Sequence, residues 1–368
     1  MYCNGIALTD FRNIEKAAVR FTEGVNVLYG KNAQGKTNLL EAIYFAALGK
    51  SFRGQHTAEV IRFDSEMASI SLDYTAAGRA QNITMRLFQG SRARAVEKNK
   101  VRITRMSELV GSFRAVLFCP EHLSLIKGGP AERRQFLDIA ISVSEPVYLS
   151  NLQRYGQALK QRNALIRRAK EEPETFKSTV DLWSAQLARE GAYIARSRAR
   201  FIRRATKYVK ECFADMSGER EVPTLVYQGC DKTGGDYEDV ERTEKELYRL
   251  LSTAHEREIG AGATLWGVHK DDVEVELNGR SARLFCSQGQ QRSLALALKL
   301  AEGELCREDC GEYPVFLLDD VLSELDGGRR DYLLRKMKGK QVILTACEEL
   351  PGFVGNRLYV ENGSVREG

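Results

Sequence analysis

The chain has 368 residues, 43% of them hydrophobic, and is long enough for two or three domains with packed cores. Its formal net charge of +5 is small, so the distribution of charge is more informative than the sum. The eight cysteines form no C-x-x-C pair, no histidines lie at metal-ligand spacing, the N-terminus lacks signal-peptide regions, and no apolar stretch approaches the roughly 20 residues that span a bilayer. These features argue against a zinc, secreted or membrane protein, and we expect a cytoplasmic one.

Strands, a loop and a helix are predicted at the start of the chain. Two short β-like runs come first, and residues 25–29 form an apolar strand that ends at Gly30. Residues 37–48 then place apolar side chains at helical spacing and stop at Gly49. From about residue 57 to residue 118 the pattern again favours β-strands.

The sequence changes character near residue 130 and changes back near residue 262. The segment between them is mostly helical and charged, without the sustained heptads of a long coiled coil. The last hundred residues predict strands, a helix, two strongly apolar strands and a closing hairpin. The simplest fold class is α/β, with one domain built from both chain ends (1–120 and 261–368) and a mostly helical arm domain inserted at 121–260.

A phosphate-binding loop follows the strand at residues 25–29. The sequence GKNAQGKT fits G-x-x-x-x-G-K-[ST] at every fixed position, and a helix opens directly after it. Glycines let backbone N–H groups converge on a phosphate, and the helix N-terminus adds unpaired N–H groups. Lys36 is expected to reach the β- and γ-phosphates of ATP, and the Thr37 hydroxyl to ligate Mg²⁺. The predicted nucleotide-binding residues are Gly30, Lys31, Asn32, Ala33, Gln34, Gly35, Lys36, Thr37 and Asn38.

An apolar strand that ends in two carboxylates provides the second motif. The sequence VFLLDD has the pattern of a Walker B strand. Asp319 is expected to help hold Mg²⁺, and Asp320 to orient the attacking water. Asp320 and Lys36 are therefore the predicted catalytic residues.

A small polar turn opens the helix about 20 residues before that strand. Ser287, Gly289 and Gln290 belong to it and are candidates to offer a hydroxyl and N–H groups to a phosphate. By itself the turn is more typical of an ordinary amphipathic helix with Ser287 as its N-cap.

The order of these three motifs resembles that of the ABC-type ATPases. In that superfamily the signature turn completes the nucleotide site of a second molecule, and the segment corresponding to SELD (323–326) is the D-loop that crosses the dimer interface. The stretches GKNAQGKTNLLEAIYFAALGKSFR, FCPEHLSLIKGGPAERRQFLD, GVHKDD, SQGQQRSLALALKLAE and LLDDVLSELDGGRRDYL together resemble the RecF family of bacterial recombination-mediator ATPases.

That resemblance implies an SMC-like, ABC-type ATPase head with an inserted helical arm. It also implies ATP-dependent dimerisation, slow hydrolysis stimulated by DNA, binding to duplex or gapped DNA, and work with RecR and RecO in loading RecA at single-strand gaps during replication and repair.

Four positions depart from the related patterns. Ala33 stands where such loops often have Gly, and we expect its φ to be negative, since a side chain there is tolerated best in that case. Asp320 replaces the usual Glu and is one methylene shorter. Cys347 stands where a switch His is usual, and no Gln lies near Cys119 at the expected Q-loop. Both the shorter acid and the missing His predict a site that holds ATP longer than it hydrolyses it.

The helical block carries most of the positive charge. From residue 154 to residue 210 there are 15 Lys or Arg against 5 Asp or Glu. Few acids lie three or four residues away along the helix, so we expect unrelieved repulsion in the absence of a polyanion, although a solvated helix face is the plainer interpretation. The predicted DNA-binding residues share one face, spaced by three and four, or flank it: Arg196, Arg200, Arg203, Arg204 and Lys207.

Three other arginines are weaker candidates. Arg53, just after the first helix, is a candidate contact to nucleotide or DNA. Arg133 and Arg134 are either further DNA contacts or structural residues that pair with Asp138 a turn later.

Three functions remain open at this point. The leading hypothesis is an ATP-dependent DNA-binding recombination mediator that dimerises on DNA. The alternative is a soluble ABC-type ATPase subunit that powers a transporter or another machine, with the helical block as its docking domain. A P-loop kinase is the third, but it leaves the Ser287 turn and SELD unexplained.

Overall fold

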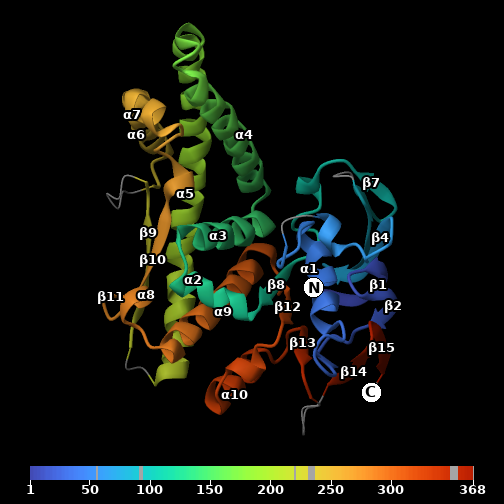
Figure 1. Ribbon diagram of the computed structural model, residues 1–368. Coiled ribbons are helices and arrows are strands. Elements are labelled where there is room, and N and C mark those ends of the chain that lie inside the picture. Colours follow the sequence, from blue (N-terminus) through green and yellow to red (C-terminus); the bar gives the residue numbers. More distant parts are fainter. Residues whose placement is uncertain (55–56, 91–93, 219–220, 231–236, 349–354, 368) are drawn as a thin grey trace. The chain divides into compact units, whose positions relative to one another are not determined.

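The computed structural model describes residues 1–368 except 55–56, 91–93, 219–220, 231–236, 349–354 and 368 (Figure 1). The chain divides into two compact units, which we call the head unit (Met1–His122 and Lys299–Gly368) and the arm unit (Leu123–Leu298). Both chain ends therefore build one unit, as the return of the α/β pattern predicted. Residues 261–298, which the sequence assigned to the head, group with the arm in this division, because strands there pair with a strand of the arm.

A parallel sheet lies at the centre of the head unit. Its strand order is β15-β14-β3-β13-β12-β8, and all neighbours are parallel except the β14–β15 hairpin. The central strands are nearly continuous apolar runs, as expected for a sheet covered on both faces. The strands are β3 (Val25–Tyr29), β8 (Ala115–Phe118), β12 (Val315–Leu318), β13 (Val342–Ala346), β14 (Asn356–Glu361) and β15 (Ser364–Glu367).

An antiparallel sheet forms the second layer of the head unit. Its order is β2-β1-β4-β5-β6-β7, and its strands alternate buried and exposed residues. They are β1 (Tyr2–Phe11), β2 (Ile14–Arg20), β4 (Met67–Ala76), β5 (Arg79–Phe88), β6 (Arg94–Lys98) and β7 (Val101–Ile103).

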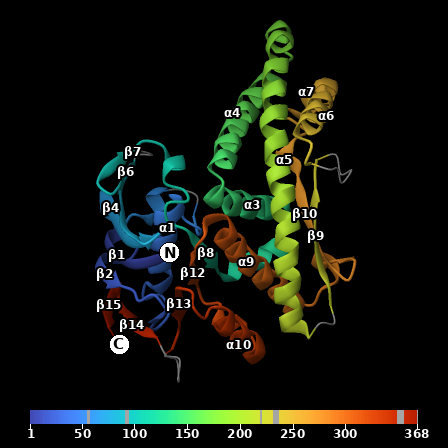
Figure 2. The same cartoon turned by 180° about the vertical axis from the view of Figure 1, so that it is seen from behind.

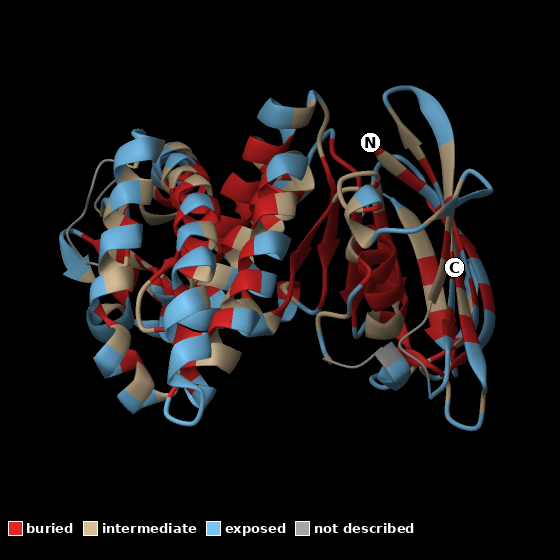
Figure 3. Ribbon diagram, turned by 90° about the horizontal axis from the view of Figure 1, so that it is seen from above, coloured by how far each residue is buried: buried red, intermediate tan, exposed pale blue. Residues whose placement is uncertain are grey.

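Helix α1 (Lys36–Leu48) shares one hydrophobic core with both sheets and is buried along most of its length. Figure 3 shows buried residues gathered inside each unit, with exposed residues on the outer faces of helices. Gly49 ends α1 with φ 67°, as the sequence predicted. The other helices of the head are η1 (Thr57–Val60), η2 (Met106–Glu108), η5 (Leu322–Glu324) and α10 (Gly327–Lys336), with η3 (Pro120–Leu123) at the unit boundary.

The arm unit is mostly helical. Two long helices, α4 (Pro146–Arg168) and α5 (Pro173–Ser217), pack along each other and begin with proline, whose missing N–H is harmless at a helix start (Figure 1). A three-stranded sheet packs on α5 through β9 (Figure 2). The remaining elements are α2 (Ser124–Lys127), α3 (Pro130–Ser144), β9 (Pro223–Gln228), α6 (Val240–Thr253), α7 (His255–Ala261), η4 (Val268–Lys270), β10 (Asp272–Leu277), β11 (Arg280–Ser281) and α8 (Ala282–Phe285).

Helix α9 (Gln288–Cys310) begins in the arm unit and ends in the head unit. In the part of the chain that the structure describes, no helix combines the length and apolarity needed to cross a membrane.

Candidate nucleotide-binding site

Three parallel strands deliver the predicted site residues to one edge of the head sheet. Strand β13 lies between β3 and β12, and Ala346 at its end is in register with Tyr29. The phosphate loop follows β3 and Asp319 follows β12, so both motifs meet at the carboxyl end of the sheet. Ligands of open α/β sheets bind at this edge.

The phosphate loop has two positions that only glycine fits. Gly30 has φ 146°, and a Cβ built on it would lie 2.3 Å from the Val360 carbonyl oxygen. Gly35 has φ 110° and precedes α1 as its N-cap. The loop is held from outside by the turn after β14, whose Asn362 N–H donates to Gln34 Oε1 at 2.7 Å. The backbone is thus fixed with the helix N-terminus open to the loop.

Ala33 does not have the negative φ that we expected. Its φ is 62°, in the left-handed region that favours glycine. For a residue with a Cβ this conformation costs about 1–2 kcal/mol. The contacts of the rest of the loop therefore hold Ala33 in this strained conformation and offset its cost.

Lys36 is buried beneath the loop. Its ammonium group donates to the carbonyl oxygens of Gly30 at 2.5 Å and of Lys31 at 2.7 Å. In loops of this pattern the lysine contacts the β- and γ-phosphates. That role of Lys36 stays a prediction.

The two predicted metal ligands are in direct contact. Thr37 Oγ1 donates to Asp319 Oδ1 at 2.9 Å. Burial raises the pKa of Asp319, while the hydrogen bonds from Thr37 and Thr345 act in the opposite direction. A hydroxyl and a carboxylate oxygen at this distance form a hard oxygen donor set, which suits Mg²⁺.

Asp320 has an unusual backbone conformation. Its φ is 52°, and its side chain is exposed and accepts a hydrogen bond from Ser323 Oγ at 2.9 Å. Ser323 is the first residue of the SELD segment, and the last, Asp326, caps α10 by accepting from the Arg329 N–H at 2.9 Å.

A cavity of about 370 Å³ gathers most of these residues. It unites Asp320 with the loop and adds Arg53 and Cys347, which the sequence analysis named, and Asn13 and Thr345, which it did not. Its lining residues are Asn13, Asn32, Ala33, Gln34, Gly35, Lys36, Thr37, Asn38, Arg53, Asp320, Thr345 and Cys347.

Arg53 lines this cavity. Its position therefore favours a nucleotide over DNA as the partner of Arg53. Its guanidinium donates to Asn38 Oδ1 at 2.8 Å, and Asn38 in turn donates to Asn13 Oδ1 at 2.8 Å. Cys347, at the expected switch position, contacts Asn32 Oδ1 at 3.1 Å. Asn13 and Thr345 had no local signal in the sequence, since neither belongs to a motif.

The signature turn lies in the arm unit and forms a reciprocal cap. The Ser287 N–H donates to Gln290 Oε1 at 2.7 Å, and the Gln290 N–H donates to Ser287 Oγ at 3.3 Å. Gln290 also donates to Glu221. This is a capping box at the start of α9, so the plainer interpretation of Ser287 accounts for its contacts within one chain. Ser287 is exposed and Gly289 partly so.

We call the predicted DNA-binding residues of α5 the basic stripe: Arg196, Arg200, Arg203, Arg204 and Lys207. Several of them have acidic partners that the sequence did not reveal. Arg196 and Arg203 contact Glu238 at 3.4 and 2.9 Å, and Arg200 contacts Glu145 at 2.7 Å. The expectation of unrelieved repulsion was therefore wrong, because acids from other elements reach the helix. The stripe nevertheless stays largely in solvent: the three arginine side chains are 41–62% exposed.

Two other members of the stripe also remain accessible. Lys207 is exposed, with its ammonium 5.6 Å from the ring centre of Tyr208, and Arg204 is half-buried. Contacts of these residues with DNA stay a prediction.

The suggested pairing of Arg133 with Asp138 was wrong. Arg133 instead forms a bidentate pair with Asp272, at 2.7 and 2.9 Å. Asp138 accepts from the buried Arg198 at 2.8 Å. Both arginines thus tie helices of the arm to the GVHKDD segment, and Arg133 has a structural role.

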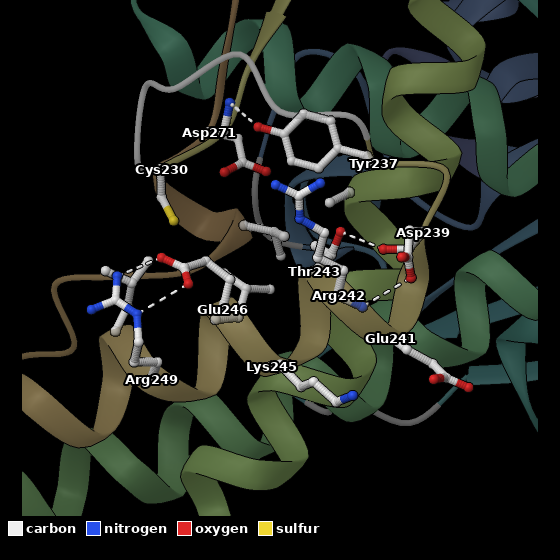
Figure 4. Close-up of a pocket in the computed structure, with 15 residues that line it drawn as sticks. Cys230, Tyr237, Asp239, Glu241, Arg242, Thr243, Lys245, Glu246, Arg249 and Asp271 are labelled. Carbon is white, nitrogen blue, oxygen red and sulfur yellow. Dashed lines mark hydrogen bonds and ion pairs between the residues drawn. The ribbon is translucent and has the colours of Figure 1, made fainter.

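A second cavity lies in the arm unit and has a volume of about 830 Å³. Figure 4 shows its mixed charges, among them the bonded pair Glu246 and Arg249 and the helix cap Asp239. Because cations and anions are mixed in its lining, we assign no ligand to it.

Comparisons with known proteins find relatives over nearly the whole chain. The family model described as "RecF/RecN/SMC N terminal domain" matches residues 2–350. A relative from Bacillus subtilis (strain 168), named "DNA replication and repair protein RecF", is 38% identical over 371 residues, covering 99% of this chain and 100% of its own. The chain belongs to the RecF family. Another RecF, from Shouchella clausii (strain KSM-K16), is 38% identical over 340 residues, covering 92% of this chain and 91% of its own.

Solved structures confirm the predicted fold class. One of "the recombination mediator protein RecF-ATPrS in RecFOR pathway" has a TM-score of 0.93 at 32% identity, covering 100% of this chain and 98% of that one. The Smc head domain from Pyrococcus furiosus shares the fold at 17% identity, with a TM-score of 0.56, covering 99% of this chain and 95% of its own. The RecF resemblance and the SMC-like, ABC-type head predicted from the motifs are therefore both correct.

Proposed function

We propose that this RecF-family chain is an ATP-dependent, DNA-binding recombination mediator that acts in DNA repair and replication. The observation that carries the proposal is the contact between Thr37 and Asp319, which joins the phosphate loop to the Walker B strand beside the cavity that Thr37 and Asp320 line. Relatives at nearly full length carry the name of a replication and repair protein, and a structural neighbour is a recombination mediator with ATP.

ATP is the proposed nucleotide, and it is named for RecF structures that this chain resembles. The N–H groups of the loop and the start of α1 receive the phosphates, with Lys36 beside them. Thr37 and Asp319 would hold Mg²⁺, which neutralises charge on the β- and γ-phosphates when bound. Asp320, on the cavity wall, orients the attacking water.

Hydrolysis is proposed to be slow. The Asp320 carboxylate is shorter than the Glu usual at this position, and Cys347 lines the cavity where a His is usual. An imidazole can exchange a proton near neutral pH, whereas an uncharged thiol does so poorly. ATP therefore acts as a latch that holds one state of the protein, and hydrolysis releases it.

The latched state is a homodimer on DNA. The exposed turn at Ser287, Gly289 and Gln290 of one copy caps the ATP bound by the other. The basic stripe on α5 contacts the phosphates of duplex or gapped DNA without reading bases. The mediator role implies RecR and RecO as partners and RecA as the protein that is loaded. Because this work is done on DNA, the proposed location of the chain is the cytoplasm.

The alternatives have less support. A subunit that powers a transporter would not be expected to match relatives named for replication and repair over its full length. A P-loop kinase needs an acceptor site, and no observation favours one here.

ATP hydrolysis with and without duplex DNA tests the proposed function. We expect a slow basal rate that DNA increases several-fold, and Lys36→Ala is expected to lose both rates, since the lost charge faces the β- and γ-phosphates. Lys127→Ala, which removes a lysine outside the cavity, serves as the matched control and should keep both. A fast rate that DNA leaves unchanged would favour the transporter-type alternative.

A further inference from the structure

One buried hydroxyl contacts both aspartates of the Walker B motif. Thr345 lies near the end of β13, the strand between β3 and β12, and is only 3% exposed. Its Oγ1 donates to Asp319 Oδ1 at 2.9 Å and accepts from the Asp320 N–H at 2.9 Å. A single threonine thus contacts the side chain of one aspartate and the backbone of the next.

The backbone bond falls at the position of greatest strain in this segment. Asp320 has φ 52°, a conformation that costs a residue with a Cβ about 1–2 kcal/mol unless its surroundings hold it. The bond to Thr345 fixes the amide of Asp320, and the bond from Ser323 fixes its carboxylate. Together they determine the direction in which this side chain enters the cavity.

Threonine suits this role better than a flexible polar residue. Its β-branch restricts χ1, so the hydroxyl is held in place by the strand itself. A hydroxyl can donate one hydrogen bond and accept two, which lets it serve both neighbours at once. Valine has nearly the same shape but can do neither.

We propose that Thr345 is a positioning residue for ATP hydrolysis, which sets Asp319 and Asp320 in the geometry that the reaction needs. This inference rests on the proposed function, because it concerns the hydrolytic step of that site. Thr345 acts through the two aspartates and not on ATP itself. Its loss should therefore lower kcat while leaving the affinity for ATP nearly unchanged.

The test compares Thr345→Val, which removes the hydroxyl, with Thr345→Ser, which keeps it. We expect kcat for ATP hydrolysis to fall about tenfold or more in the valine variant, with KM within about threefold of wild type. The serine variant should keep kcat within about threefold. Equal rates in the valine variant and wild type, or an equal loss in both variants, would overturn the proposal.

Two further measurements separate positioning from general damage. Amide hydrogen exchange of the peptide that contains Asp320 should be faster in Thr345→Val and unchanged in Thr345→Ser, because only the first loses the acceptor. In an Asp320→Asn background, Thr345→Val should lower kcat by a smaller factor than it does in wild type, since the part of its effect that acts through Asp320 is already lost. Additive losses, or unchanged exchange, would contradict the proposal.

These outcomes distinguish the inference from the proposed function. If wild-type protein bound ATP but hydrolysed none, the hydrolytic step of the proposed function would fail, while hydrogen exchange would still test the contact. If wild type hydrolysed ATP and Thr345→Val matched it, only the inference would fail. Should the valine variant not fold, Thr345→Ala with the same serine comparison replaces it.

Discussion

At the residue scale, Ala33 is the position where the phosphate loop is under strain. Its left-handed φ of 62° is one that glycine adopts freely. Replacement by glycine removes about 1–2 kcal/mol of strain, partly offset by about 0.4–1 kcal/mol from the more flexible unfolded chain.

Ala33→Gly should therefore raise the free energy of unfolding by about 0.5 kcal/mol, without weakening ATP binding. Chemical denaturation of both proteins measures the difference. Gly78→Ala is the matched comparison, since it places a Cβ at a similar φ of 69°, with no other atom within 4 Å of it, and should be destabilising. A clear loss of stability in Ala33→Gly would contradict the φ assigned to this residue.

The residues of the site differ in how far the sequence could predict them. The loop from Gly30 to Thr37 is a contiguous motif, so its chemistry is local and can be recognised directly. Thr345 and Asn13 contribute through contacts with residues 25 or more positions away in the chain. No spacing rule identifies such residues, because their contacts depend on the order of strands in the sheet, which the local sequence does not determine.

At the scale of the elements, acidic residues of the protein and the phosphates of DNA compete for the arginines on the basic face of α5. Glu238 contacts both Arg196 and Arg203, which competes with any phosphate for these guanidinium groups. Such exposed pairs are worth at most about 1 kcal/mol, so a polyanion can displace them.

The structure therefore predicts opposite effects for two substitutions in this pair. Arg203→Ala should weaken DNA binding and reduce the slope of log K against log salt by about 0.9, the value for one lost phosphate contact. Glu238→Gln should strengthen binding, because it releases two arginines. Affinities measured across a salt series test both, and an unchanged slope in Arg203→Ala would place the DNA contacts on another surface.

The elements of the head were more predictable than the extent of the arm. Strand β3, helix α1 and strand β12 follow from apolar runs with clear ends at Gly30, Gly49 and Asp319. The grouping of residues 261–298 with the arm depends on β10 pairing with β9, across a segment of more than 40 residues. Long-range strand pairing of this kind leaves no periodic signal in the sequence.

At the scale of the whole molecule, the proposed latch divides the nucleotide site between two units of the chain. The phosphate loop and both aspartates lie in the head unit, and the Ser287 turn lies in the arm unit. The proposed latch requires the turn of one copy to meet the ATP of another. ATP should therefore control the oligomeric state, and through it the hold on DNA.

Ser287 offers a way to separate its role as a cap from its role in the dimer. Ser287→Asp keeps a good N-cap for α9, so the variant should unfold with nearly the stability of wild type. The added negative charge would face the phosphates of the partner copy and should oppose closure. A variant that loses the dimer but keeps its stability would then show that Ser287 contributes to the contact with the second copy, apart from its role as a helix cap.

The most direct test of the central claim is the molar mass measured by light scattering with ATP and Mg²⁺, at concentrations where the protein alone is monomeric. We predict that wild type shifts to a dimer when ATP is added and returns to a monomer with ADP. Lys36→Ala and Ser287→Asp are predicted to remain monomeric under both conditions. A wild-type mass that does not respond to ATP, or a Ser287→Asp variant that dimerises as wild type does, would contradict the claim that ATP joins two copies through this turn.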